Sequence, residues 1–354
     1  MVGLLWFLLG LVGLTVLLQL VARLFRVPIA TSLLGDIAWL PAHWAAPSNE
    51  GQPVWLTTPD GFRLHGRYLP TPAFRRRGVI AFCHDLNGDQ WTARLYTQEL
   101  SRRGFDIFAF DFRHHGGSDR HPGYEPTPWV SQYELLDLRT VIDYLCSRPD
   151  AHSQSIGLFG INRGGTAALC AAASDPRVAA VVVDGPVPTE RLQLQTARRL
   201  LRRCFLPAAL VRAIPESPLT LLGTWAKWVV GFHYDCQLIN VDHAVRKVIQ
   251  PVLLINGRHE TYASPDVVRE LRTAIPGPAK LWTLPRSMPG RAVTAAAHSY
   301  HRRIVRFFAS QLDRPVAVHR AQPAVRAPLA LDRSPAAAPL SSHPAIAFRT
   351  LPRS

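Results

Sequence analysis

The sequence predicts an α/β domain between about residues 52 and 313, built on a mostly parallel sheet with helices on both faces. Two observations predict this fold class. Short continuous apolar runs, typical of buried strands, alternate with segments whose apolar residues recur at helical spacing. In addition, Asp60-Gly61 separates two strand-like segments, which predicts an antiparallel hairpin at the start of the domain.

The elements of this domain follow from those patterns. Strands are expected at residues 54–58, 63–69, 78–83, 105–110, 156–159, 178–183, 252–255 and 281–284. Helices are expected over 91–103, 130–146, 166–173, 267–274 and 300–312. The long segment 186–248 interrupts the alternation and is helical in composition. We expect it to be a helical lid over the carboxyl ends of the strands, where such sheets bind ligands.

The first residues predict a membrane anchor. Residues 2–21 are almost wholly apolar, and about 20 such residues span a bilayer as a helix. No Lys or Arg precedes this segment, whereas Arg23 and Arg26 follow it. We therefore expect a single-pass anchor over 1–26, with membrane lipid around residues 2–22 and the bulk of the chain facing the cytoplasm. A cleaved signal peptide is the alternative.

The regions that flank the domain carry no signal for a core of their own. Residues 27–51 are expected to be a linker, and 314–354, rich in Pro, Ala and Arg, to be a disordered basic tail. The formal net charge of +15 suits anionic partners such as acidic lipid. No zinc-finger spacing or RNA-binding signature accompanies it, so nucleic acid is not expected as a partner.

One segment carries the pattern of a catalytic turn. A strand enters the sequence Gly-Ile-Asn-Arg-Gly at 160–164, and a helix of small residues leaves it. This segment resembles the nucleophile elbow of α/β-hydrolases, a turn so tight that its flanking residues must be glycine. Residues 81–88 resemble the oxyanion loop of that family, 111–119 its Asp-x-Arg-x-His-Gly-x-Ser segment, and 255–260 its acid-bearing loop.

The resemblance is greatest to the serine-aminopeptidase-like and dienelactone-hydrolase-like branches, and it implies an eight-stranded α/β-hydrolase fold with a lid. It also accounts for the His114-His115 pair without a metal, and it implies no cofactor. The family's nucleophilic serine, however, corresponds to Asn162 in this chain. An asparagine has no hydroxyl for a histidine to deprotonate, yet it tolerates the positive φ of the turn.

Of the other two catalytic positions, only the acid position keeps the residue type of the family. Glu260 falls where the family places its acid, but the histidine position corresponds to Pro289. His298 could serve as the base only in a rearranged loop; otherwise it and His301 are solvated residues of the last helix. The oxyanion donors should be the backbone N–H groups of Arg163 and of Asp85 or Leu86.

Asp85 stands where relatives usually carry glycine, and two interpretations of it remain open. Its carboxylate either faces the oxyanion site, where it would disfavour a developing oxyanion, or points away and caps a turn. A further open question concerns the basic stripe of the lid, Arg198, Arg199, Arg202 and Arg203. It is either a solvated face or a contact for lipid headgroups or an anionic ligand.

Three functional hypotheses follow. In the first, the chain is a membrane-anchored pseudo-hydrolase that binds a small or lipid-like ligand in a lid-covered pocket, or a partner on its surface. In the second, it is an active hydrolase of esters or amides with a non-standard catalytic set, for example Asn162 deamidated to aspartate with His298 as base. In the third, it is a structural membrane-tethered protein whose functional segment is the basic tail.

Overall fold

The computed structural model describes residues 46–149, 155–203, 207–258, 264–285 and 292–312. The predicted anchor, most of the predicted linker and the predicted tail lie outside these residues, as do Glu260 and Pro289. No helix in the described part of the chain is long and apolar enough to cross a membrane.

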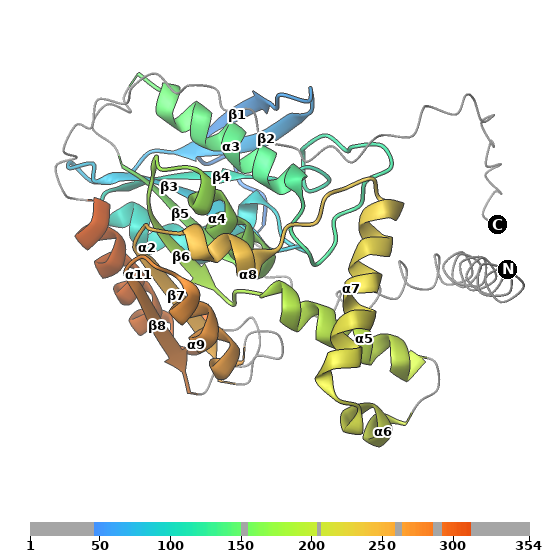
Figure 1. Ribbon diagram of the computed structural model, residues 1–354. Coiled ribbons are helices and arrows are strands. Elements are labelled where there is room, and N and C mark those ends of the chain that lie inside the picture. Colours follow the sequence, from blue (N-terminus) through green and yellow to red (C-terminus); the bar gives the residue numbers. More distant parts are fainter. Residues whose placement is uncertain (1–45, 150–154, 204–206, 259–263, 286–291, 313–354) are drawn as a thin grey trace, which may run out of the picture. The chain divides into compact units, whose positions relative to one another are not determined.

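An eight-stranded sheet occupies the centre of the described domain, in the order β1-β2-β4-β3-β5-β6-β7-β8 (Figure 1). β1 pairs antiparallel with β2, and β2 antiparallel with β4, while the other neighbours pair in parallel. The strands are β1 (Gln52–Thr57), β2 (Arg63–Leu69), β3 (Gly78–Cys83), β4 (Phe105–Phe110), β5 (Ile156–Ile161), β6 (Val178–Asp184), β7 (Val252–Gly257) and β8 (Ala279–Leu284). The predicted mostly parallel eight-stranded sheet is confirmed.

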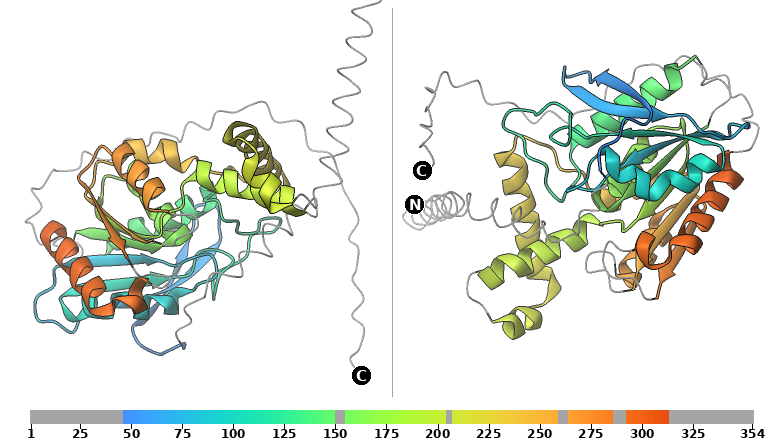
Figure 2. Two further views of the ribbon diagram at one scale, coloured as in Figure 1. Left: turned by 90° about the horizontal axis from the view of Figure 1, so that it is seen from below. Right: turned by 180° about the vertical axis from the view of Figure 1, so that it is seen from behind.

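Helices cover both faces of this sheet (Figures 1 and 2). One face carries α3 (Gln132–Ser147), α4 (Asn162–Ser174), α8 (Val241–Ala244) and α9 (Pro265–Ala274). The other face carries α2 (Ala93–Arg102) and α11 (Ala297–Leu312). The domain also contains the short helices η2 (Gln90–Thr92), η4 (Val245–Lys247) and α10 (Ala292–Ala295). Because both faces are covered, β3, β4, β5 and β7 are buried at all six positions, which is why their sequences are continuous apolar runs.

A helical insertion follows β6 and extends away from the sheet (Figure 1). It consists of α5 (Thr189–Arg203), α6 (Ala208–Ala213) and α7 (Glu216–His233), and it is called here the insertion (189–233). α7 lies so close to α5 that a Cβ at Gly223 would collide with the backbone carbonyl of Gln193. The insertion makes up most of the segment 186–248 that the sequence predicts to be a lid.

Helix starts differ from the predicted ones. α4 begins at Asn162 rather than at residue 166, and α11 begins at Ala297 rather than at 300. Glycine has a low intrinsic helix propensity, so the two glycines after Asn162 conceal the first turn of α4. Tertiary packing overrides that propensity, because Gly164 lies directly against the backbone of the loop that follows β3.

Candidate functional site

The elbow is the direct junction of β5 and α4 at Asn162. Asn162 has φ +45°, a left-handed conformation that asparagine adopts more readily than most residues. A Cβ at Gly160 would collide with the backbone of Gly165, and one at Gly164 would collide with the carbonyl oxygen of His84. The sequence therefore folds as a tight strand–turn–helix that presses against the loop after β3.

The carboxylate of Asp85 lies in this turn rather than away from it. Its Oδ2 accepts a hydrogen bond from the Asn162 side-chain amide at 2.8 Å. Its Oδ1 accepts from the backbone N–H of Leu86 at 2.7 Å and from that of Arg163 at 3.4 Å. The two backbone donors expected to form an oxyanion hole, and the side chain at the nucleophile position, thus converge on one carboxylate of the same chain.

Burial raises the pKa of Asp85 above its usual value, although the hydrogen bonds from Asn162, Leu86 and Arg163 act in the opposite direction. The reason is that a carboxylate removed from water loses solvation that these donors only partly replace. A second negative oxygen in the same place would be strongly disfavoured, since two unit charges about 4 Å apart repel by roughly 4 kcal/mol near a protein surface. The site can hold its own carboxylate or a substrate oxyanion, but not both.

Two histidines fix the loop that carries Asp85. His84 Nε2 accepts from the backbone N–H of Phe112 at 3.0 Å, which leaves Nδ1–H to donate to the carbonyl of Asp85 at 2.7 Å. His115 has its ring nitrogens 2.9 Å and 2.7 Å from the carbonyl oxygens of Arg113 and Leu86. Burial holds the pKa of His84 well below its usual value, so this ring is neutral. Both rings therefore orient the oxyanion loop and are engaged with backbone groups.

A buried ion pair links the elbow to α3. The side chain of Arg163, 4% exposed, lies 2.7 Å from a carboxylate oxygen of Glu134, and its guanidinium also donates to the hydroxyl of Tyr124. Although burial raises the pKa of Glu134, the charge of Arg163 and the hydrogen bonds from Tyr124 and Ser131 lower it more, so its net pKa lies below the usual value. Glu134 also closes the capping box of α3 with Ser131.

The remaining candidate residues do not join this cluster in the described chain. His298 lies exposed in the first turn of α11 and lines a groove with residues of α2 such as Glu99 and Arg102. Among the described residues, the Asn162 side chain hydrogen-bonds only with Asp85. The structure thus brings together Asn162, Asp85, Leu86 and Arg163. Within the same residues, no group of three or more His, Cys, Asp or Glu side chains is placed to hold a metal ion.

Comparison with known proteins identifies the architecture. A family model described as alpha/beta hydrolase fold matches residues 78–204. The Pyrococcus furiosus esterase Pf2001 superimposes with a TM-score of 0.58 at 21% identity, covering 77% of this chain and 97% of the esterase. The dienelactone hydrolase of Anabaena variabilis gives a TM-score of 0.51 at 18% identity, covering 74% and 98% of the two chains.

The chain has the α/β-hydrolase fold.

Relatives in sequence have less specific descriptions. The chain is 25% identical to the uncharacterized protein YfhR of Escherichia coli O157:H7 over 234 residues, which is 63% of this chain and 77% of YfhR. It is 21% identical to the alpha/beta hydrolase domain-containing protein WAV2 of Arabidopsis thaliana, covering 72% of this chain and 75% of WAV2. These similarities leave the reaction open.

The domain holds two residues near the elbow that the sequence patterns miss. Gly185 follows β6 with φ +71°, and a Cβ there would collide with Oδ1 of Asn162. The preceding residue, Asp184, accepts a hydrogen bond at 2.7 Å from the hydroxyl of Tyr300 in α11. The sequence signals these two residues only through the run Asp-Gly-Pro at the end of a buried strand. That signal is weak, because turn residues at strand ends are common.

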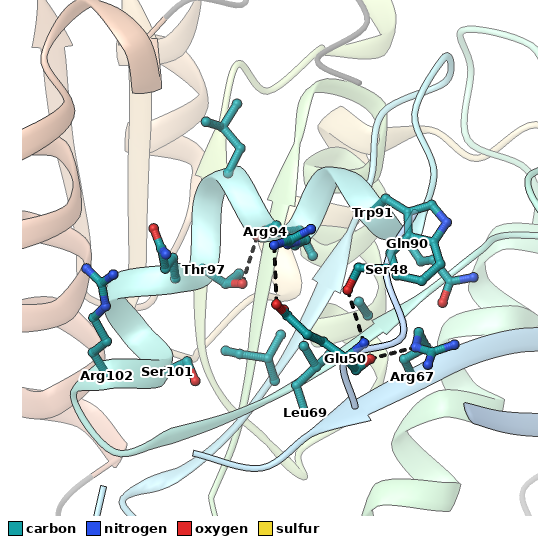
Figure 3. A pocket seen from close by; sticks show the side chains of 15 residues that line it. Ser48, Glu50, Arg67, Leu69, Gln90, Trp91, Arg94, Thr97, Ser101 and Arg102 are labelled. Atoms are coloured by element: carbon teal, nitrogen blue, oxygen red, sulfur yellow. Dashed lines mark hydrogen bonds and ion pairs between the residues drawn. The ribbon is translucent and has the colours of Figure 1, made fainter. Parts of the chain in front are cut away.

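The same domain also contains a cavity of about 450 Å³ away from the elbow, between α2 and strands β2 and β4 (Figure 3). Its arginines already have partners within the chain. The Glu50 carboxylate lies 3.3 Å from Arg94, and Arg67 donates to the backbone carbonyl of Glu50 at 2.7 Å (Figure 3). Asn162, Asp85 and Arg163 are not among the residues that line this cavity, so it is not the pocket of the elbow.

Proposed function

We propose that this chain is a membrane-anchored α/β-hydrolase homologue that has lost hydrolysis by the serine mechanism and acts by binding a ligand or partner. One observation carries the proposal. The carboxylate of Asp85 accepts from the amide of Asn162 and from the backbone N–H groups of Leu86 and Arg163. The donors that would stabilise an oxyanion are therefore already occupied by an anion.

Two chemical arguments support the same conclusion, one from the nucleophile position and one from the oxyanion donors. An amide at position 162 offers no hydroxyl to a base, and the loss of a nucleophile costs a serine hydrolase several orders of magnitude in rate. Losing a single oxyanion donor costs about 10²–10³ in kcat, and here both backbone donors are engaged. Two independent requirements of the mechanism are thus missing at once.

The test is reactivity of the purified full chain toward a fluorophosphonate probe and p-nitrophenyl esters. We expect no labelling and no ester hydrolysis above the uncatalysed rate. Labelling at the elbow would overturn the proposal. The variant Asn162→Ser alone should remain inert because Asp85 still fills the oxyanion site. Combining it with Asp85→Gly and Pro289→His should allow measurable hydrolysis, and activity from the single variant would contradict the role given to Asp85.

Membrane anchoring and a cytoplasmic domain are the second part of the proposal. The apolar segment 2–21, the arginines that follow it and the net charge of +15 support it. Extraction of the full chain from membranes by detergent but not by alkaline carbonate is the expected result. Deleting 314–354 should leave this behaviour unchanged; release on deletion would favour the tail as the attachment.

Ester or amide hydrolysis by a non-standard catalytic set is the alternative. Its support is the chain's structural likeness to proteins described as esterases and a dienelactone hydrolase. One version has Asn162 deamidated to aspartate with His298 as base. Mass spectrometry of the elbow peptide separates the two proposals, because an unmodified asparagine excludes that version. If turnover is found, its loss in His298→Ala would assign the base.

A further inference from the structure

The insertion (189–233) carries a row of exposed apolar side chains. Four of the seven large apolar side chains that are most exposed in the described chain belong to it: Leu210 (56%), Leu221 (73%), Trp228 (63%) and Phe232 (63%). Leu221, Trp228 and Phe232 are separated by seven and four residues, so they lie on one face of α7. A contiguous apolar face of this kind is typical of a contact surface, whereas single exposed apolar residues are ordinary.

This face is held in place by the rest of the insertion. The opposite side of α7 buries Leu219, Ala226 and Val230, and Gly223 lies against the backbone of α5. The rings of Trp228 and Phe232 stack with centroids 5.7 Å apart and planes inclined by 19°. Since the helix is fixed by its buried side, binding through the exposed rings would not require the backbone of α7 to be ordered first.

The charge of the insertion is strongly one-sided. Residues 189–233 contain six arginines and one lysine against two glutamates. Arg191 and Arg198 share Glu216, at 3.7 Å and 3.4 Å. Arg202 and Arg212 are exposed, and neither forms an ion pair with another described residue. Anionic headgroups complement this charge, while a hydrocarbon boundary accepts Trp, Phe and Leu.

We propose that the exposed face of α7, with Arg202 and Arg212, docks the insertion onto a bilayer that contains anionic lipid. This rests in part on the proposed anchor, which would hold the domain near such a surface. About two dozen residues separate the end of the apolar segment at Val21 from the first described residue. A chain of that length reaches at most roughly 80 Å when extended, so the proposed anchor would keep residue 46 within that distance of the membrane.

The experiment uses the full chain in vesicles of phosphatidylcholine and phosphatidylglycerol whose acyl chains carry bromine, which quenches tryptophan fluorescence on contact. Each tryptophan is isolated as the emission lost on substitution. Trp228→Phe reports the face of α7, Trp6→Phe reports the predicted anchor, and Trp55→Phe is the matched control. Trp55 lies on β1, away from the insertion, and is 53% exposed. We expect quenching of Trp228 and Trp6 but not of Trp55.

The outcomes separate the two proposals. Quenched Trp6 with unquenched Trp228 overturns docking and retains the anchor, whereas the reverse retains docking and overturns the anchor. Unquenched Trp228 in a chain that sediments as a dimer would assign the face to a second copy and overturn the lipid contact. Arg202→Gln with Arg212→Gln should shift the docking equilibrium about fivefold per charge, as expected for a basic side chain near an anionic surface. No shift would overturn the electrostatic part.

Discussion

At the elbow, the donors of Asn162, Leu86 and Arg163 all meet the carboxylate of Asp85, whereas α7 presents Trp228 and Phe232 at 63% exposure each. The first region satisfies its polar groups internally, at the place where a hydrolase would leave them for a substrate. The second leaves apolar groups in water, where a soluble surface would carry polar ones. We propose that binding has moved from the turn to the outer face of the insertion. The substitutions below test whether the elbow is held by its internal contacts and whether the exposed face of α7 is dispensable for the fold.

The largest effect on the free energy of unfolding is expected at the buried ion pair between Arg163 and Glu134. Glu134→Gln leaves the buried guanidinium of Arg163 without its counter-charge. Removing one partner of a buried pair typically costs about 3–5 kcal/mol, and we expect that loss in the free energy of unfolding measured with urea. Glu190→Gln, at an exposed position of the insertion, should change it by less than about 0.5 kcal/mol. Equal small losses would show that the elbow is not held more rigidly than the insertion.

Gly185→Ala tests the contact that places the Asn162 side chain. The position has φ +71°, and the added methyl would strike Oδ1 of Asn162, so we expect a loss of about 1–3 kcal/mol in stability. Gly123 is a matched control, because it has φ +78° and nothing within 4 Å of an added Cβ. Part of the extra cost at Gly185 should disappear in an Asn162→Gly background. Identical costs at Gly185 and Gly123 would contradict the contact.

The titration of Asp85 is expected to have a smaller effect on folding stability, and the direction of this effect with pH is defined. Its folded-state pKa is raised, so the folded chain holds this proton more tightly than the unfolded chain. Stability from this group is fully present below the unfolded pKa near 3.8 and is lost as pH rises through the folded pKa. Relative to Asp85→Asn, the wild type should therefore gain stability as pH falls within that window. One pKa unit corresponds to about 1.4 kcal/mol.

At Asp119 we expect the opposite dependence of folding stability on pH. Hydrogen bonds from Arg63 lower its pKa, so its stabilisation is present above the unfolded pKa and is lost as pH falls through the folded one. Relative to Asp119→Asn, the wild type should lose stability in acid. Thermal unfolding of the wild type, Asp85→Asn and Asp119→Asn between pH 7 and 3 measures both effects. The same sign at both carboxylates would show that Asp85 is not held in a desolvated site.

The smallest effect is expected on α7. Leu221→Ser and Phe232→Ser should each change the free energy of unfolding by about 0.5 kcal/mol or less, because these side chains already lie in water. Leu219→Ala on the buried side of the same helix, 1% exposed, should cost about 2–5 kcal/mol. Losses above about 1.5 kcal/mol at Leu221 or Phe232 would mean that they serve the fold rather than a partner.

Much of the fold could be predicted because its signals are local. The buried strands are continuous apolar runs, and β2, β3 and β4 have the bounds that the pattern predicts. The start of α4 was missed because glycine has a low helix propensity, and the close approach of Gly164 to His84 is a contact between distant segments. The predicted histidine position, Pro289, and acid position, Glu260, lie outside the described residues and stay predictions.

The sequence by itself determined that an amide stands at the turn after β5, since residue identity and apolar periodicity are properties of neighbouring positions. Only the tertiary structure decided where the carboxylate of Asp85 points, because its partner Asn162 is 77 residues away and a short side chain can rotate toward or away from it. The exposed face of α7 has the same origin. A helix with apolar residues all round gives no sign of which side packs, and only its contact with α5 leaves Trp228 and Phe232 outside.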